Sequence, residues 1–151
     1  MEDCRTMNVG TYEQLIDEKG RIILPGAFRQ AFGKTLFISL GFDDCLCLWR
    51  NEDFESFVEK EIEKRSDLSR AQRQVNRWLH SSAHLLSIDS QNRFVIPQLL
   101  RKKSLLEREV VLVGAGARVE IWSKKAWEDY IAKADDSIEE IAESLSREFR
   151  V

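Results

Sequence analysis

Two short segments carry long cations at a spacing suited to nucleic-acid recognition. The nonapeptide 17–25 (DEKGRIILP) is answered 72 residues later by 89–97 (DSQNRFVIP). Each begins with Asp, carries Arg four residues on and ends in Pro after three apolar residues. A turn that presents Lys19, Arg21 and Arg93 outward would place their charges against the phosphates and base edges of DNA. The simpler alternative is a solvated turn in which the Asp and Arg of each motif bridge each other.

A second group of cations occupies the middle of the chain. Arg70, Arg73 and Arg77 follow one another at the spacing of one helical face, which makes them further candidates for DNA contact. A solvated helix face explains the same pattern.

The chain shows no pattern typical of a catalytic or metal site. His80 and His84 have the spacing of a helical metal pair but lack the HExxH pattern. Cys45 and Cys47 are expected to point to opposite faces of a strand, so we predict no metal between them. Segment 114–116 (GAG) precedes a predicted strand rather than a helix, which favours a hairpin turn over a dinucleotide site. We predict no enzyme, no cofactor and no small-molecule substrate.

The two nonapeptides belong to a longer repeat, whose elements must hold them in place. A Gly-to-Trp strand pair follows each of them, in segments 36–49 and 110–122, at an offset of 73 because one residue is inserted. Gly20 and Asn92 occupy the turn position that requires a positive φ, which Gly and Asn tolerate best. The repeat therefore predicts two similar hairpin tips.

Each half of the repeat is predicted to contain the same series of elements. An extended segment precedes the turn, and Pro fixes the start of a short helix after it. The predicted elements are extended segments 9–16 and 83–88, short helices 26–33 and 98–105, and longer helices 51–64 and 123–134. Trp49 and Trp122 close equivalent strands, a position typical of core residues.

The halves are expected to share one core around a pseudo-two-fold. Apolar residues at helical spacing predict a connecting helix over 68–81, and no Pro/Gly-rich spacer separates the halves. The predicted boundaries are 7–64 for the first module, 65–82 for the linking helix, 83–134 for the second module and 135–151 for a C-terminal helix. This last helix would carry an apolar stripe suited to oligomerisation, formed by Ile138, Ile141, Leu145 and Phe149.

Composition limits the class of protein further. A hydrophobic content of 43% supports a core, and a net charge of −3 argues against coating nucleic acid through overall charge. Three cysteines in no framework pattern predict free thiols in a reducing cytosol. No apolar run is long enough to span a membrane, so we expect a cytoplasmic protein.

These motifs resemble the MraZ family of bacterial regulators, within the AbrB-like swapped-hairpin superfamily. The resemblance rests on the paired D-x-x-x-R motifs, the strand pairs GFDDCLCLW and GAGARVEIW, and the middle helix RAQRQVNRWLHSSAH. It implies an α+β fold of two tandem swapped-hairpin modules, of the double-split β-barrel type, with flanking helices. It also implies a ring-shaped homo-oligomer, associated with the nucleoid, that binds direct repeats in double-stranded DNA upstream of its own division and cell-wall operon. By motif match, Lys19, Arg21 and Arg93 would contact that DNA.

The sequence departs from the family pattern in two places. Gln91 and Asn92 stand where the first motif has Lys19 and Gly20, so the second tip lacks one cation. Residues 1–6 precede the usual family start and are interpreted as an extension or a misassigned start.

Two other classes of protein share parts of this pattern. An AbrB-like antitoxin would carry the hairpin, but normally in one copy with a disordered tail. An oligomeric adaptor would keep the assembly and lose specific DNA binding.

Overall fold

The computed structural model describes residues 7–63 and 69–148. The first half contains β1 (Thr11–Leu15), β2 (Arg21–Ile23), α1 (Gly26–Arg29), β3 (Thr35–Leu40), β4 (Leu46–Trp49), α2 (Asn51–Phe57) and its π-helical continuation η1 (Val58–Glu63). Helix α3 (Arg70–Ser82) then leads to β5 (His84–Ser87), β6 (Arg93–Val95), α4 (Gln98–Lys103), β7 (Glu109–Gly114), β8 (Arg118–Ser123) and α5 (Lys124–Glu148). The predictions that fall on residues 1–6, 64–68 and 149–151, Phe149 among them, lie outside the described residues.

Strands of the two halves interleave in both sheets. The larger sheet has the order β1-β7-β8-β4-β3-β5, and the smaller one pairs β2 with β6. Strands β1, β2 and β4 therefore pair with β7, β6 and β8 of the other half, and β3 pairs with β5. The α+β fold of two tandem swapped-hairpin modules is confirmed.

A pseudo-two-fold axis relates the halves and crosses both sheets. In β2–β6, Ile22 pairs with Phe94, its own equivalent in the repeat. In β4–β8, Cys47 likewise pairs with its equivalent, Glu120. Because only residues on an axis can pair with their own equivalents, the axis passes between the members of each pair.

Local sequence explains the turns that bracket β2 and β6. Gly20 and Asn92 have φ of 80° and 62°, as predicted from their tolerance of this region. Pro25 and Pro97 cap α1 and α4 with φ of −55° and −54°, which confirms the predicted helix starts. Since the same residue types hold the same positions, both halves leave their tips in the same way.

Two apolar clusters lie on opposite faces of the larger sheet's centre. The first includes Ile22 and Phe94 beneath the β2–β6 ribbon. The second includes Trp49, Trp122 and Leu79 against the helices. Both tryptophans are 3% exposed, so their predicted place in the core is confirmed.

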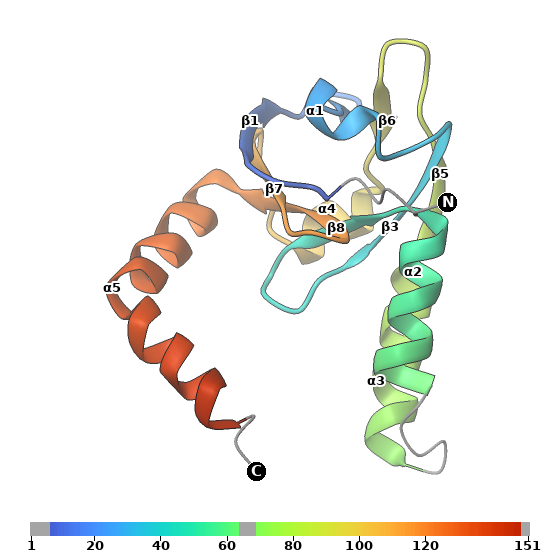
Figure 1. Ribbon diagram of the computed structural model, residues 1–151. Coiled ribbons are helices and arrows are strands. Elements are labelled where there is room, and N and C mark those ends of the chain that lie inside the picture. The colour runs from blue at the N-terminus through green and yellow to red at the C-terminus, as the bar shows by residue number, and fades with distance from the viewer. Residues whose placement is uncertain (1–6, 64–68, 149–151) are drawn as a thin grey trace, which may run out of the picture.

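The helices extend from the strands in two directions (Figure 1). Helices α2 and α3 run side by side, whereas α5 packs on β7 and β8 and extends away from that pair. In place of the separate helices predicted over 123–134 and 135–151, the described residues form one continuous helix from Lys124 to Glu148, which contains no Gly or Pro. None of the described helices is long and apolar enough to cross a membrane.

Candidate nucleic-acid interface

The first hairpin tip is organised by the carboxylate of Asp17. Its Oδ1 accepts hydrogen bonds from the backbone N–H groups of Lys19 and Arg21, each at 2.9 Å. Its Oδ2 accepts from Nε of Arg21 at 2.7 Å. The backbone N–H of Gly20 closes the turn on the carbonyl of Asp17 at 3.0 Å. The Asp–Arg bridge that was the alternative to DNA contact is therefore present.

The second tip repeats this geometry. Oδ1 of Asp89 accepts from the backbone N–H groups of Gln91 at 2.9 Å and Arg93 at 2.8 Å. Its Oδ2 accepts from Nε of Arg93 at 3.0 Å. The backbone N–H of Asn92 donates to the Asp89 carbonyl at 3.0 Å.

These hydrogen bonds perturb both carboxylates in the same direction. The backbone N–H of Arg21, followed by its side chain, lowers the pKa of Asp17 below its ordinary value of 3.8. The backbone N–H of Arg93 is likewise the main cause of the lowered pKa of Asp89. Both carboxylates are therefore ionised near neutral pH and hold their arginines by charge as well as by geometry.

The Asp–Arg bridge orients each guanidinium but uses only some of its N–H donors. Only Nε of Arg21 and Arg93 is bonded within the described residues, which leaves the Nη1 and Nη2 pair available to a ligand. Their side chains are 32% and 30% exposed. A guanidinium held through Nε keeps the planar fork that binds phosphate or guanine in a bidentate manner.

Both arginines lie on the outer face of the two-stranded ribbon. Arg21 pairs with Val95, and Arg93 pairs with Ile23, so one cation stands at each end of the ribbon. Their cross-strand partners, Ile23 and Val95, are each 49% exposed. The intervening Ile22 points into the core, because alternate residues of a strand face opposite sides.

Two further arginines support the tips, and we did not include them among the predicted site residues. Nε of Arg29 on α1 donates to Oδ1 of Asn92 at 2.6 Å. Arg101 on α4 lies against the first tip, so a Cβ added to Gly20 would come within 2.9 Å of its guanidinium. The two arginines occupy equivalent positions of the repeat, and this equivalence is the sequence feature that could have indicated their role. Each helix therefore braces the tip of the other half.

The arginines of α3 lie apart from the ribbon. Helix α3 packs on β3 and η1 and extends away from β6 in Figure 1. Arg70, Arg73 and Arg77 are exposed on it, so the expected set of site residues divides into two separate basic regions. Arg73 also has a partner within the molecule.

Comparison with known proteins identifies the family. The family model described as "MraZ protein, putative antitoxin-like" matches the chain twice, over residues 7–77 and 79–148. The chain belongs to the MraZ family. The Transcriptional regulator MraZ of Heliobacterium modesticaldum is 39% identical over 140 residues, which cover 92% of this chain and 96% of that protein. The protein of the same name from Caldanaerobacter subterraneus subsp. tengcongensis is 36% identical over 139 residues, with the same coverage of both chains.

The MraZ family consists of transcriptional regulators and not of enzymes, which confirms the prediction that the chain is not an enzyme. The structure also confirms the hairpin turn at 114–116, which joins β7 to β8 with Gly116 at φ 77°. His80 and His84 do not form a helical pair, since α3 ends at Ser82 between them.

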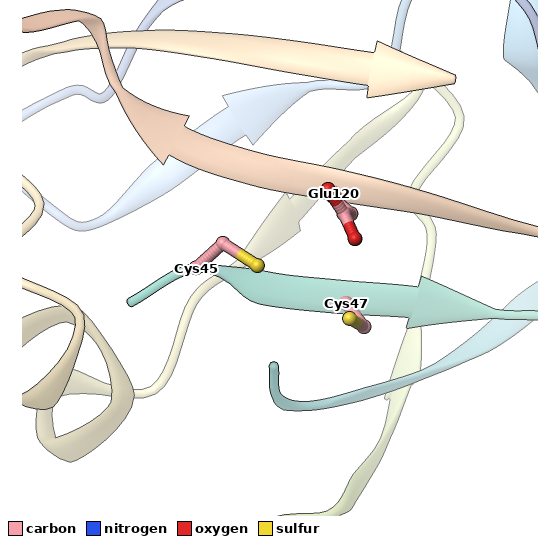
Figure 2. A group of neighbouring side chains, drawn as sticks. All are labelled: Cys45, Cys47 and Glu120. Carbon is pink, nitrogen blue, oxygen red and sulfur yellow. The ribbon is translucent and has the colours of Figure 1, made fainter. Parts of the chain in front are cut away.

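The predicted orientation of two cysteines was wrong. Residues two apart in an extended segment face the same side, so Cys45 and Cys47 point together rather than to opposite faces (Figure 2). Both thiols are free and buried, and Glu120 of β8 lies beside them. A hydrogen bond with the Cys45 thiol, together with burial, raises the pKa of Cys47 well above its ordinary value of 9.0.

Proposed function

We propose that this chain regulates transcription by binding specific double-stranded DNA through the outer face of the β2–β6 ribbon. The observation that carries the proposal is the pair of guanidinium groups, Arg21 and Arg93, each held by its own carboxylate through Nε. An antiparallel two-stranded ribbon fits the major groove, where a bidentate Arg reads guanine. The names of the curated relatives support the same class of function.

The residues proposed to contact DNA fall into two ranks. Arg21 and Lys19 at the first tip form the leading set, with Arg93 contributing from the second. Arg70, Arg73 and Arg77 form a subordinate set, because α3 extends away from the ribbon.

The proposal includes assembly into a ring-shaped homo-oligomer on direct repeats. One subunit offers Lys19, Arg21 and Arg93 at its ribbon on a body of net charge −3, so several linked subunits would gain affinity through effective concentration. Helix α5 exposes Ile138, Ile141 and Leu145, which supports an interface there. A groove of about 550 Å³ beside α3, lined by Phe42, Phe57, Ile62 and Val75 among others, offers a counterpart of different shape. Two unlike surfaces of this kind suit a head-to-tail ring.

Footprinting on the DNA upstream of the chain's own coding region tests this proposal. We expect protection of direct repeats about 10 to 10.5 base pairs apart, since ring subunits present their ribbons in the same sense. An insertion of about five base pairs between repeats should abolish most binding, and a full-turn insertion should restore part of it. An inverted repeat, or insensitivity to the half-turn insertion, would contradict the ring mechanism.

Footprinting, together with light scattering, distinguishes a regulator from an adaptor and from an antitoxin-like protein. An adaptor would assemble in light scattering at micromolar concentration without protecting any DNA. An antitoxin-like protein would bind DNA as a two-fold dimer on a palindrome. If light scattering shows only monomers, the ring is excluded.

A further inference from the structure

Three metal-ligating side chains converge where the pseudo-two-fold axis crosses the larger sheet. The Sγ atoms of Cys45 and Cys47 and a carboxylate oxygen of Glu120 all lie within 4.8 Å of one another (Figure 2). Cys45 and Cys47 are 1% and 4% exposed. Cys47 and Glu120 are direct partners across β4 and β8, so the two halves of the chain both contribute.

The absence of a side chain at Gly41 makes room for the sulfur atoms of Cys45 and Cys47. A Cβ added to Gly41 would lie 2.6 Å from Sγ of Cys45 and 3.0 Å from Sγ of Cys47. The N–H of Gly41 donates to the carbonyl of Cys45 at 2.7 Å, which extends the β3–β4 pairing past Leu46. The hairpin therefore fixes both thiols on one side before any ligand arrives.

The carboxylate has the outer hydrogen bonds that a metal ligand needs. Its Oε2 accepts from Nε of Arg118 at 3.1 Å, and its Oε1 accepts from Nε1 of Trp122 at 3.0 Å. Each carboxylate oxygen has a second lone pair, so these bonds orient Glu120 without preventing coordination. The side chain of Glu120 is 13% exposed, which places it at the edge of the same apolar cluster.

The charge of the group selects a divalent cation. Two thiolates and Glu120 carry three negative charges, and Arg118 carries one positive charge. A divalent cation makes the buried group neutral once both thiol protons have left for solvent, whereas a monovalent cation leaves one negative charge. Thiolates favour Zn²⁺ or Cu⁺, and of these two ions the carboxylate oxygen favours Zn²⁺.

We propose that Cys45, Cys47 and Glu120 form a Zn²⁺ site that joins the two halves of the chain at the pseudo-two-fold axis. Three protein ligands leave a fourth tetrahedral position for water. Binding releases two protons and adds a link between β4 and β8, so it stabilises the folded chain. The site lies against the cluster of Trp49, Trp122 and Leu79 and on the opposite face from the DNA-contacting ribbon.

Cobalt substitution tests the site in the full-length chain. After removal of metal with a chelator under reducing conditions, added Co²⁺ should produce a thiolate-to-cobalt charge-transfer band that saturates at one equivalent per chain. Zn²⁺ should abolish the band and raise the melting temperature. Cys45→Ser and Cys47→Ser should each lose the band, and Glu120→Gln should weaken Zn²⁺ binding by at least about ten-fold.

The third cysteine provides the matched control. Cys4→Ser should keep the band and the stoichiometry of the unmodified chain, because Cys4 is not one of the three ligands. Loss of the band in Cys4→Ser, or its persistence in both Cys45→Ser and Cys47→Ser, would overturn the assignment. Since the band is first measured on the unmodified chain, its absence from folded, reduced protein overturns the proposal even if every variant misfolds.

Discussion

The two hairpin tips have the same backbone and different surfaces. In both, an Asp carboxylate accepts two backbone N–H groups and one Arg Nε, and the fourth residue adopts a positive φ. The carboxylate and the positive φ form the turn, and they are retained in both copies. The cation beside them is not retained, because Lys19 corresponds to Gln91.

The helices that support the tips, α4 for the first and α1 for the second, also differ in positive charge. Helix α4, which lies against the first tip through Arg101, also carries exposed Lys102 and Lys103. The equivalent positions, directly after α1, are Gln30 and Ala31. Both tips therefore share the Asp–Arg turn, while the cations proposed to contact DNA are concentrated at the first tip.

The largest expected effect separates Arg21 from Arg93. Removal of a bidentate hydrogen-bonding pair to a base costs about 1–3 kcal/mol of binding free energy, so Arg21→Ala should weaken operator binding by that amount. Arg93→Ala should cost less, because fewer cations surround it. Fluorescence anisotropy at fixed salt measures both. Equal effects, or a larger effect for Arg93→Ala, would reverse the order of the tips.

A second difference concerns the fourth residue of each turn. Asn92→Ala should lower the free energy of unfolding by about 2 kcal/mol, since it places Ala at positive φ and leaves Nε of Arg29 without its acceptor. Gly20→Ala should cost about 1 kcal/mol, from backbone strain and displacement of the flexible end of Arg101. Urea denaturation compares the two variants. A greater cost for Gly20→Ala would show that Asn92 and Arg29 do not support the second tip.

Exchange of the tip cations should alter the salt dependence of binding. Lys19→Gln makes the first tip resemble the second, and the slope of log K against log salt should fall by about 0.9 for each phosphate that the tip no longer neutralises. Gln91→Lys is the reciprocal variant and should steepen the slope if its tip reaches a phosphate. An unchanged slope in Lys19→Gln would remove Lys19 from the interface.

The smallest expected effect is shared by the tips. Because the folded-state pKa of Asp17 and of Asp89 is lowered from 3.8, their contribution to stability is present above pH 3.8 and lost as pH falls through the lowered values. Asp17→Asn and Asp89→Asn should each reduce this acid sensitivity in urea denaturation, and by similar amounts. A marked difference between them would contradict the equivalence of the two turns.

The repeat allowed the turns to be predicted but not the pairing of the strands. Gly20, Asn92, Pro25 and Pro97 act through local backbone preferences, so their roles are visible in the sequence. Alternation of apolar residues shows which face of a strand is buried and not which strand lies beside it. The exchange of β1 and β5 between halves therefore came from the family resemblance alone.

The residues of the candidate site differ in how far the sequence could indicate them. Lys19, Arg21 and Arg93 could be named because the motif places them at a turn. Arg29 and Arg101 act across the pseudo-two-fold, and such interactions depend on strand exchange. Strand periodicity alone places Cys45 and Cys47 on the same side, contrary to the predicted orientation. The position of Glu120 beside them depends on the pairing of β4 with β8.

Site-specific photocrosslinking to operator DNA tests the central claim most directly. A photoreactive residue at position 23, where Ile23 is 49% exposed on the outer face of the ribbon, should crosslink to DNA containing the direct repeats. The matched controls are position 74 on α3 and position 136 on α5, where Gln74 and Asp136 are exposed outside both surfaces proposed for the ring interface. We expect a strong crosslink from position 23 and little from the others. A crosslink from position 74 with none from position 23 would contradict the account and place the DNA on the arginines of α3.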